Sequence, residues 1–186
     1  AKDEHTPREP ASVTKVMTLL LVAEAVESGA VSPDDPVTAS RRAASMGGSQ
    51  IWLEEGEVMT VAEMTKCVAV VSANDCAVAM AEYISGSEDA FVERMNQRAA
   101  ELGLENTQYR NPSGLDAEGH YSSARDLAAL AAHALENEDF EDIVSKQEIR
   151  MAFGNPPYNR SLYTTNKLLE RYPNVTGYAD APDYLN

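Results

Sequence analysis

The sequence has very few of the residues that build metal and thiol sites. It contains only 2 cysteines and 3 histidines in 186 residues. Metal sites need several such ligands close together, and neither Cys67 nor Cys76 has a histidine near it in the sequence. Both cysteines lie among small apolar residues, where a free thiol packs as a small hydrophobe. A disulfide between them is an alternative that the sequence leaves open. The sequence predicts no metal and no cysteine nucleophile.

Positive charge and long apolar runs are also scarce. The chain has 15 Lys and Arg against 30 Asp and Glu, for a formal net charge of −15. This balance argues against a nucleic-acid partner, because phosphate binding requires basic patches. Apolar runs such as Leu19 to Ala23 are far shorter than the ~20 residues of a membrane span. With 44% hydrophobic residues, the chain is expected to bury the core of a single soluble domain.

Apolar periodicity predicts a mostly helical middle. Helices are expected at 60–71, with a capping box from Thr60 and Glu63, and at 75–84. An amphipathic helix is expected from Glu88 to Leu102, followed by helices at 127–135 and 139–146. Residues 150–153 and 161–165 have strand-like composition and flank a Gly-Asn-Pro-Pro turn.

Ser12 and Lys15 form the first candidate catalytic pair. A long apolar run from Val13 to Val26 predicts a helix that opens near Ser12 and is too apolar to be exposed. Residues three apart share a helix face, so the Lys15 amine is expected to reach the Ser12 hydroxyl. A desolvated lysine can remove the proton of a serine and make it a nucleophile. Taken alone, the pattern also fits a capping serine and a surface lysine.

Ser72 and Asn74 form the second candidate motif. They are expected at the end of one helix and the start of the next, on a short turn that carries a hydroxyl and an amide. Such residues also commonly cap helices. Other serine chemistries lack support, because the sequence has no Gly-x-Ser-x-Gly elbow and no motif that carries a histidine of a catalytic triad.

In this order the motifs resemble the D-alanyl-D-alanine carboxypeptidases, which are low-molecular-mass penicillin-binding proteins and serine peptidases of the cell wall. The resemblance extends from Arg8 to Tyr178. The stretches that carry it are Pro10–Lys15, Met46–Ile51, Ser72–Asp75, Asn111–Asp116, Gly119–Ser122, Thr165–Leu169, and Tyr172-Pro173 leading to Thr176-Gly177-Tyr178.

The resemblance implies an α+β fold of the serine DD-peptidase and β-lactamase type, in which an antiparallel sheet is flanked by helices. It implies that Lys15 activates Ser12, that the Ser72 hydroxyl relays a proton, and that Asn74 positions the lysine and the substrate. Thr176, Gly177 and Tyr178 would bind substrate, and a backbone N–H near Tyr178 would complete an oxyanion hole with that of Ser12. The implied substrate is a peptidoglycan stem peptide ending in D-Ala-D-Ala, β-lactams would acylate Ser12, and no cofactor is needed.

The sequence departs from the family at its third motif, Lys-Thr-Gly. Here Val175 precedes Thr176, and no lysine stands before the threonine. Three explanations stay open: residues omitted between 175 and 176, a loop lost in evolution, or an engineered change. Residues 1–186 are expected to form one catalytic domain that lacks N-terminal strands, the segment at 175–176 and C-terminal strands. The first residues are charged, so no signal peptide is evident, and the resemblance implies an extracytoplasmic protein of the cell envelope.

Two alternative functions remain open. A class A β-lactamase needs a glutamate in Glu-x-x-Leu-Asn, and the nearest sequence, which begins at Glu101, is out of register by one residue. A catalytically silent wall-binding protein would keep the fold without the lysine of the third motif.

Overall fold

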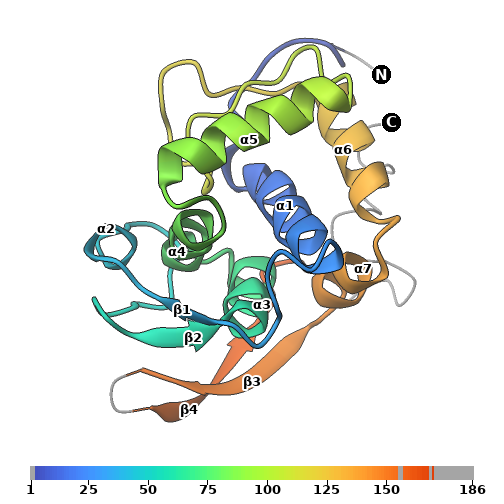
Figure 1. Ribbon diagram of the computed structural model, residues 1–186. Coiled ribbons are helices and arrows are strands. Elements are labelled where there is room, and N and C mark those ends of the chain that lie inside the picture. The colour runs from blue at the N-terminus through green and yellow to red at the C-terminus, as the bar shows by residue number, and fades with distance from the viewer. Residues whose placement is uncertain (1–2, 155–156, 168, 170–186) are drawn as a thin grey trace.

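The computed structural model describes residues 3–154, 157–167 and 169. Its helices surround one central helix, α1 (Lys15–Glu27), which is drawn in blue in the middle of Figure 1. α1 contacts α3 (Val61–Val71), α4 (Asn74–Ser85), α5 (Glu88–Glu101), α6 (Ala124–Ala134) and α7 (Glu138–Val144). A short helix, α2 (Arg41–Ala44), packs against α4.

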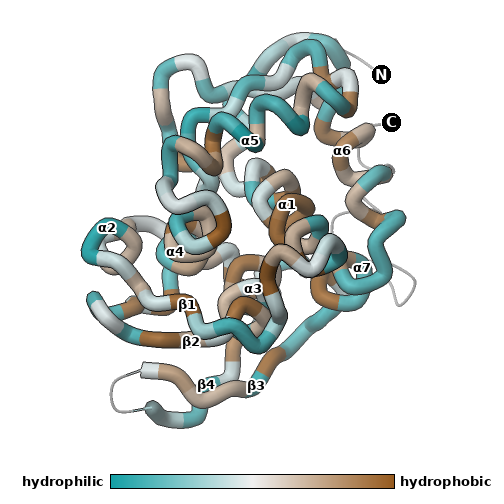
Figure 2. Tube along the Cα trace, in the orientation of Figure 1, coloured by the Kyte–Doolittle hydropathy of each residue, from teal (hydrophilic) through white to brown (hydrophobic). Residues whose placement is uncertain are grey.

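α1 is central because its sequence is apolar on almost every side. Every residue from Lys15 to Val22 is buried, and the stretch is among the most hydrophobic of the chain in Figure 2. A helix that is hydrophobic all round is stable only inside a protein. Of the other helices, α3, α5 and α6 bury one face, and α5 turns Phe91, Met95 and Ala99 inward as its sequence predicts. In α4 every residue from Asn74 to Ala81 is buried.

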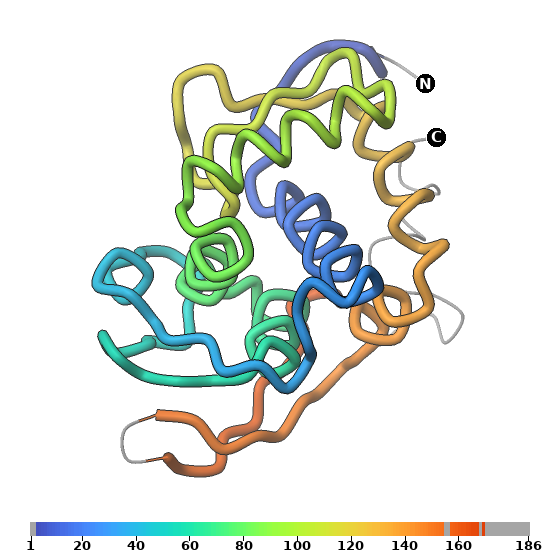
Figure 3. The backbone as a smooth tube through the Cα atoms, viewed as in Figure 1, coloured from blue at the N-terminus to red at the C-terminus, as the bar shows by residue number. Residues whose placement is uncertain are grey.

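The strands form two small antiparallel pairs beside the helices. β1 (Pro36–Thr38) pairs with β2 (Val58–Thr60), with Val37 opposite Met59. β3 (Glu148–Phe153) pairs with β4 (Tyr158–Tyr163), with Phe153 opposite Tyr158, and both strands contact α3 (Figure 3).

Most expected elements are confirmed. Thr60 and Glu63 form the capping box of α3, and Ser123 caps α6 through its side chain. The two predicted strands exist but run from 148 to 153 and from 158 to 163. Pairing begins both strands earlier than their apolar segments suggest, and the second ends at 163 rather than at the predicted 165. The sequence did not predict β1, β2 or α2, which have only three or four residues each.

The two cysteines are free and buried. They lie on α3 and α4, on either side of the turn at 72–73, and burial raises the pKa of the Cys76 thiol. Among the described residues, no helix is long and apolar enough to cross a bilayer.

Candidate active site

Ser12 lies in a single 3-10 turn, η1 (Ala11–Thr14), that leads directly into α1. Side chains three residues apart eclipse each other in a 3-10 helix, which aligns Ser12 with Lys15. Lys15 Nζ lies 3.3 Å from Ser12 Oγ, and this confirms the predicted contact. Ser12 itself is exposed, so the hydroxyl is open to a substrate while the amine is enclosed.

Lys15 is completely buried, with 0% of its surface exposed. Removal from water disfavours the ammonium form, and this desolvation lowers the pKa of Lys15 to about 8. The direction is the one predicted from the sequence. With this value about one amine in ten is neutral at pH 7, and the neutral form dominates above pH 8.

The loop at 111–115 also holds the lysine. Lys15 Nζ donates a hydrogen bond of 2.5 Å to the carbonyl oxygen of Ser113, and Thr18 Oγ1 donates one of 2.7 Å to that of Pro112. The side-chain oxygen of Asn111 fixes the loop by accepting from the N–H groups of Ser113 and Gly114. This stretch is among the segments that resemble the family in sequence, but the sequence did not predict a part for it in the site.

Gly114 packs directly against the turn that carries the nucleophile. Its φ is +83°, and a Cβ added there would lie 1.9 Å from the carbonyl oxygen of Ala11. Ala11 itself has a φ of 47°, so the residue before Ser12 also adopts the left-handed conformation that side chains disfavour. Such strain persists only where the surroundings impose it, and it concentrates at functional sites.

Replacement of Gly114 with alanine is expected to lower both stability and activity. The left-handed conformation and the clash together should reduce the free energy of unfolding by about 2–5 kcal/mol. The carbonyl of Ala11 can relieve the clash only by moving η1, so acylation of Ser12 should slow in the folded fraction as well. Denaturant unfolding and the rate of β-lactam acylation measure the two effects.

Gly103→Ala is the matched control for this prediction. Gly103 has a φ of +69°, but nothing lies within 4 Å of an added Cβ. The free energy of unfolding of the control should fall by only about 1–2 kcal/mol, the cost of the left-handed conformation. The folded control should be acylated normally. Equal effects of the two substitutions would contradict a role for Gly114 in placing Ser12.

Ser72 and Asn74 lie where the sequence predicted, at the junction of α3 and α4. Ser72 follows the last residue of α3 with a φ of 59°, and Asn74 is the first residue of α4. Neither side chain caps a helix, which removes the structural explanation for the motif. Ser72 Oγ and Asn74 Oδ1 are buried and have no hydrogen-bond partner among the described residues. Buried polar atoms are rarely left unpaired, and catalytic function is one reason for it.

A loop before β2 fixes Asn74 and its neighbour. Asn74 Nδ2 donates to the carbonyl oxygen of Gly47 at 2.7 Å, and the Asn74 N–H donates to that of Ser49 at 2.7 Å. Burial raises the pKa of the next residue, Asp75, although its carboxylate accepts backbone N–H groups that oppose the shift. The sequence placed Asp75 in a family-like stretch and did not predict these contacts.

His120 has a structural position next to the site. Its Nδ1 accepts from the Arg110 N–H at 3.1 Å, so in the neutral ring Nε2 carries the proton and donates to Thr14 Oγ1 at 2.8 Å. Burial lowers the pKa of His120, which favours this neutral form. The ring thereby ties the 120 region to η1.

The predicted substrate-binding residues Thr176, Gly177 and Tyr178 lie outside the described residues, as does the break between 175 and 176. The structure places Lys15 beside Ser12 and places Ser72 and Asn74 at the junction of α3 and α4, two helices that both pack against α1. Among the residues described, no group of three or more His, Cys, Asp and Glu could hold a metal ion.

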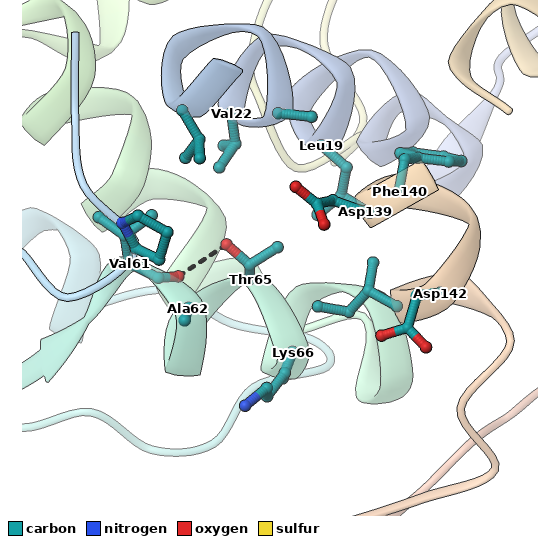
Figure 4. A pocket seen from close by; sticks show the side chains of 13 residues that line it. Leu19, Val22, Val61, Ala62, Thr65, Lys66, Asp139, Phe140 and Asp142 are labelled. Atoms are coloured by element: carbon teal, nitrogen blue, oxygen red, sulfur yellow. Dashed lines mark hydrogen bonds between the residues drawn. The ribbon is translucent and has the colours of Figure 1, made fainter. Parts of the chain in front are cut away.

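An apolar pocket lies away from these residues, between α1, α3 and α7 (Figure 4). It has a volume of about 200 Å³ and is lined by residues such as Leu19, Val22, Val61 and Phe140. On α1 it involves the half of the helix after Thr18, and on α3 the half before Cys67. Ser12 precedes α1 and Ser72 follows α3, so the pocket is at the opposite end of the helix pair.

Comparison with known proteins identifies the family of this chain. The family model of D-alanyl-D-alanine carboxypeptidases matches residues 1–180. The chain is 48% identical over 187 residues to the D-alanyl-D-alanine carboxypeptidase DacF of Bacillus subtilis, covering 98% of this chain and 48% of that protein. The chain belongs to the D-alanyl-D-alanine carboxypeptidase family.

Further members of the carboxypeptidase family are also similar. DacD of Escherichia coli is 39% identical over 156 residues, which cover 80% of this chain and 40% of DacD. The crystal structure of penicillin-binding protein 6B from Escherichia coli superposes with a TM-score of 0.81 at 36% identity, covering 90% of this chain and 53% of that one. Penicillin-binding protein 5 from Haemophilus influenzae gives a TM-score of 0.83 at 34% identity, with coverages of 92% and 49%.

These structures confirm the predicted α+β fold class of the DD-peptidases. The chain spans about half the length of the curated carboxypeptidases that it matches.

Proposed function

We propose that this chain carries the nucleophile, the base and the proton-relay residues of a serine-type D-Ala-D-Ala carboxypeptidase. The observation that carries the proposal is the contact of 3.3 Å between Lys15 Nζ and Ser12 Oγ, in which the amine is fully buried and the hydroxyl is exposed. A nucleophile next to a base that a third group orients is the common arrangement of nucleophilic catalysis, and here the Ser113 carbonyl orients the base.

In this mechanism neutral Lys15 accepts the Ser12 proton as Ser12 Oγ attacks the carbonyl carbon of the penultimate D-alanine. The Ser12 N–H supplies one hydrogen bond to the oxyanion. The peptide bond then breaks, and the terminal D-alanine leaves with a proton relayed through the Ser72 hydroxyl. Asn74 positions the substrate amide through its unpaired Oδ1. Water hydrolyses the acyl-enzyme and returns Ser12 to its resting state.

Recognition of the terminal carboxylate is assigned to Thr176, with Gly177 and Tyr178 completing the substrate site. The intact protein is expected to have a lysine immediately before Thr176, because the resemblance to the family is otherwise continuous. A fixed positive charge beside a hydroxyl selects substrates with a free C-terminal carboxylate. We assign no cofactor to the reaction.

The substrate is proposed to be the peptidoglycan stem peptide, with β-lactams as covalent inhibitors that mimic its D-Ala-D-Ala end. Peptidoglycan lies outside the cytoplasm, so the protein is proposed to act in the cell envelope. The names of its relatives support this assignment, since they are carboxypeptidases and penicillin-binding proteins.

Neither alternative has a comparable observation in its favour. Glu101, the residue that a β-lactamase would need, ends α5, and its carboxylate lies 3.1 Å from Arg98 Nη1. The hypothesis of a silent wall-binding protein requires that the third-motif lysine be absent. It also gives the buried Lys15 amine no function.

Cleavage of matched peptides tests the proposed function. The full-length enzyme should release D-alanine from a peptide ending in D-Ala-D-Ala and act far less on its C-terminal amide, because loss of a buried charge pair costs about 2–5 kcal/mol. D-Alanine release can be quantified with a coupled amino-acid assay. Sequencing the encoding DNA across codons 175 and 176 shows independently whether a lysine precedes Thr176. Equal cleavage of acid and amide would contradict recognition of the terminal carboxylate, and cleavage of neither would favour the silent wall-binding protein.

A further inference from the structure

Trp52 combines strain and exposure in one residue. Its φ is 59°, in the left-handed region where a bulky side chain is a genuine outlier, and 72% of the residue is exposed. It is the most exposed large hydrophobic residue in the part of the chain that the structure describes. Strained backbone costs about 1–3 kcal/mol and persists only where the surroundings impose it.

Backbone contacts on both sides of Trp52 impose this conformation. The N–H groups of Ile51 and Leu53 donate to the Asp75 carboxylate at 3.0 and 3.1 Å, and both side chains are buried. The carbonyl oxygen of Ile51 also accepts from Arg160 Nη1 at 3.0 Å. With both neighbours fixed inward, the indole is held outward in a rigid frame, which is the condition for a preorganised binding surface.

The same frame includes the proposed catalytic asparagine. Asn74 precedes Asp75, and its side chain and N–H hold Gly47 and Ser49 at the start of the segment that carries Trp52. Five residues of extended chain span at most about 18 Å, so Trp52 lies within that distance of Gly47. An extended peptide advances about 3.3 Å per residue, so every three residues upstream of D-Ala-D-Ala extend the substrate by about 10 Å, a length in the same range.

We propose that the face of Trp52 binds an ammonium group on the substrate, upstream of D-Ala-D-Ala. The inference rests on the proposed carboxypeptidase function and adds a specificity residue to it. Tryptophan is the best aromatic partner for a cation. The exposed charged residues that follow it, Glu54 and Glu55, are both acidic and do not repel an ammonium group. The nearby Arg160 is already engaged, with its guanidinium 4.2 Å from the ring of Phe153 and 4.3 Å from that of Tyr158.

Two peptides of the same length test this inference with the full-length enzyme. Both end in D-Ala-D-Ala after an L-lysine, whose side chain is free in one peptide and acetylated in the other. The wild-type enzyme should have a kcat/KM about 2–30-fold higher for the free amine, mainly through a lower KM. Trp52→Ala should abolish this preference, and Trp52→Phe should keep part of it.

Tyr163→Ala is the matched control, because Tyr163 is a similarly exposed aromatic residue on β4, 63% exposed, outside this frame. It should leave the preference unchanged. Trp52→Ala should still form a β-lactam adduct at the wild-type rate, which shows that the catalytic residues are intact.

Either of two results with Trp52→Ala would overturn the assignment. Trp52→Ala could retain the preference, or it could lower kcat/KM equally for both peptides, which would mean an apolar contact only. If Trp52→Ala retains the preference and the double variant Glu54→Gln, Glu55→Gln abolishes it, the preference for the free amine would come from the two carboxylates. If the wild-type enzyme releases D-alanine from no peptide, the proposed function fails and the role of Trp52 fails with it.

Discussion

Substitution of Ser12 by alanine should eliminate the covalent β-lactam adduct and lower D-alanine release by several orders of magnitude, as loss of a serine nucleophile does in other enzymes. The exposed Ser12 hydroxyl lies 3.3 Å from the amine that can deprotonate it. Intact-mass analysis of the wild-type protein with penicillin should show one adduct, and peptide mapping should place it on Ser12. The exposed position also means that the free energy of unfolding should change by no more than about 0.5 kcal/mol.

Ser28→Ala provides the matched control for this result. Ser28 follows the last residue of α1, at the opposite end of the helix from Ser12, and its hydroxyl donates to the Ala25 carbonyl. This variant should form the adduct normally. A wild-type adduct on another residue, or an undiminished adduct in Ser12→Ala, would refute the assignment of the nucleophile.

Lys15→Arg is expected to nearly abolish acylation, because a guanidinium group stays protonated and cannot act as a base near neutral pH. In the wild-type enzyme only the neutral amine accepts the Ser12 proton. The acylation rate should therefore rise with pH and level off above about 8, the value to which desolvation lowers the pKa of Lys15. Stopped-flow measurement with a chromogenic β-lactam across pH 6 to 10 gives this profile.

Lys66→Arg controls for the exchange itself, since Lys66 lies in the first half of α3 and lines the apolar pocket away from Ser12. It should acylate at the wild-type rate. An acylation rate that is flat between pH 6 and 9 in the wild type would argue against Lys15 as the base, whether or not the arginine variant folds.

The same burial links Lys15 to stability. The unfolded chain keeps the ordinary lysine pKa of 10.5, whereas the folded value is about 8. Between these values the unfolded state binds more protons, so the Lys15 contribution makes the free energy of unfolding rise with pH in this window. Below pH 8 the folded protein carries the full cost of a buried ammonium group.

Elements whose signals are local could be predicted from the amino-acid sequence. The apolar run after Ser12 specifies a buried central helix, because no face of it can be exposed to water. Thr60 and Glu63 fix the start of α3 through contacts within one turn. The spacing of Ser12 and Lys15 is likewise local, and one turn of helix is enough to bring the two side chains together.

The activation and positioning of these residues depend on contacts between distant segments, which the sequence did not predict. Lys15 has a lowered pKa because the surrounding helices exclude water from it, and its amine is held by the carbonyl of Ser113, a residue 98 positions away. Likewise, Asp75 holds the backbone on both sides of Trp52 from more than twenty residues away. Neither contact has a periodicity or a local motif, since backbone carbonyls and N–H groups are the same in every sequence and only the packing of distant segments selects which of them meet.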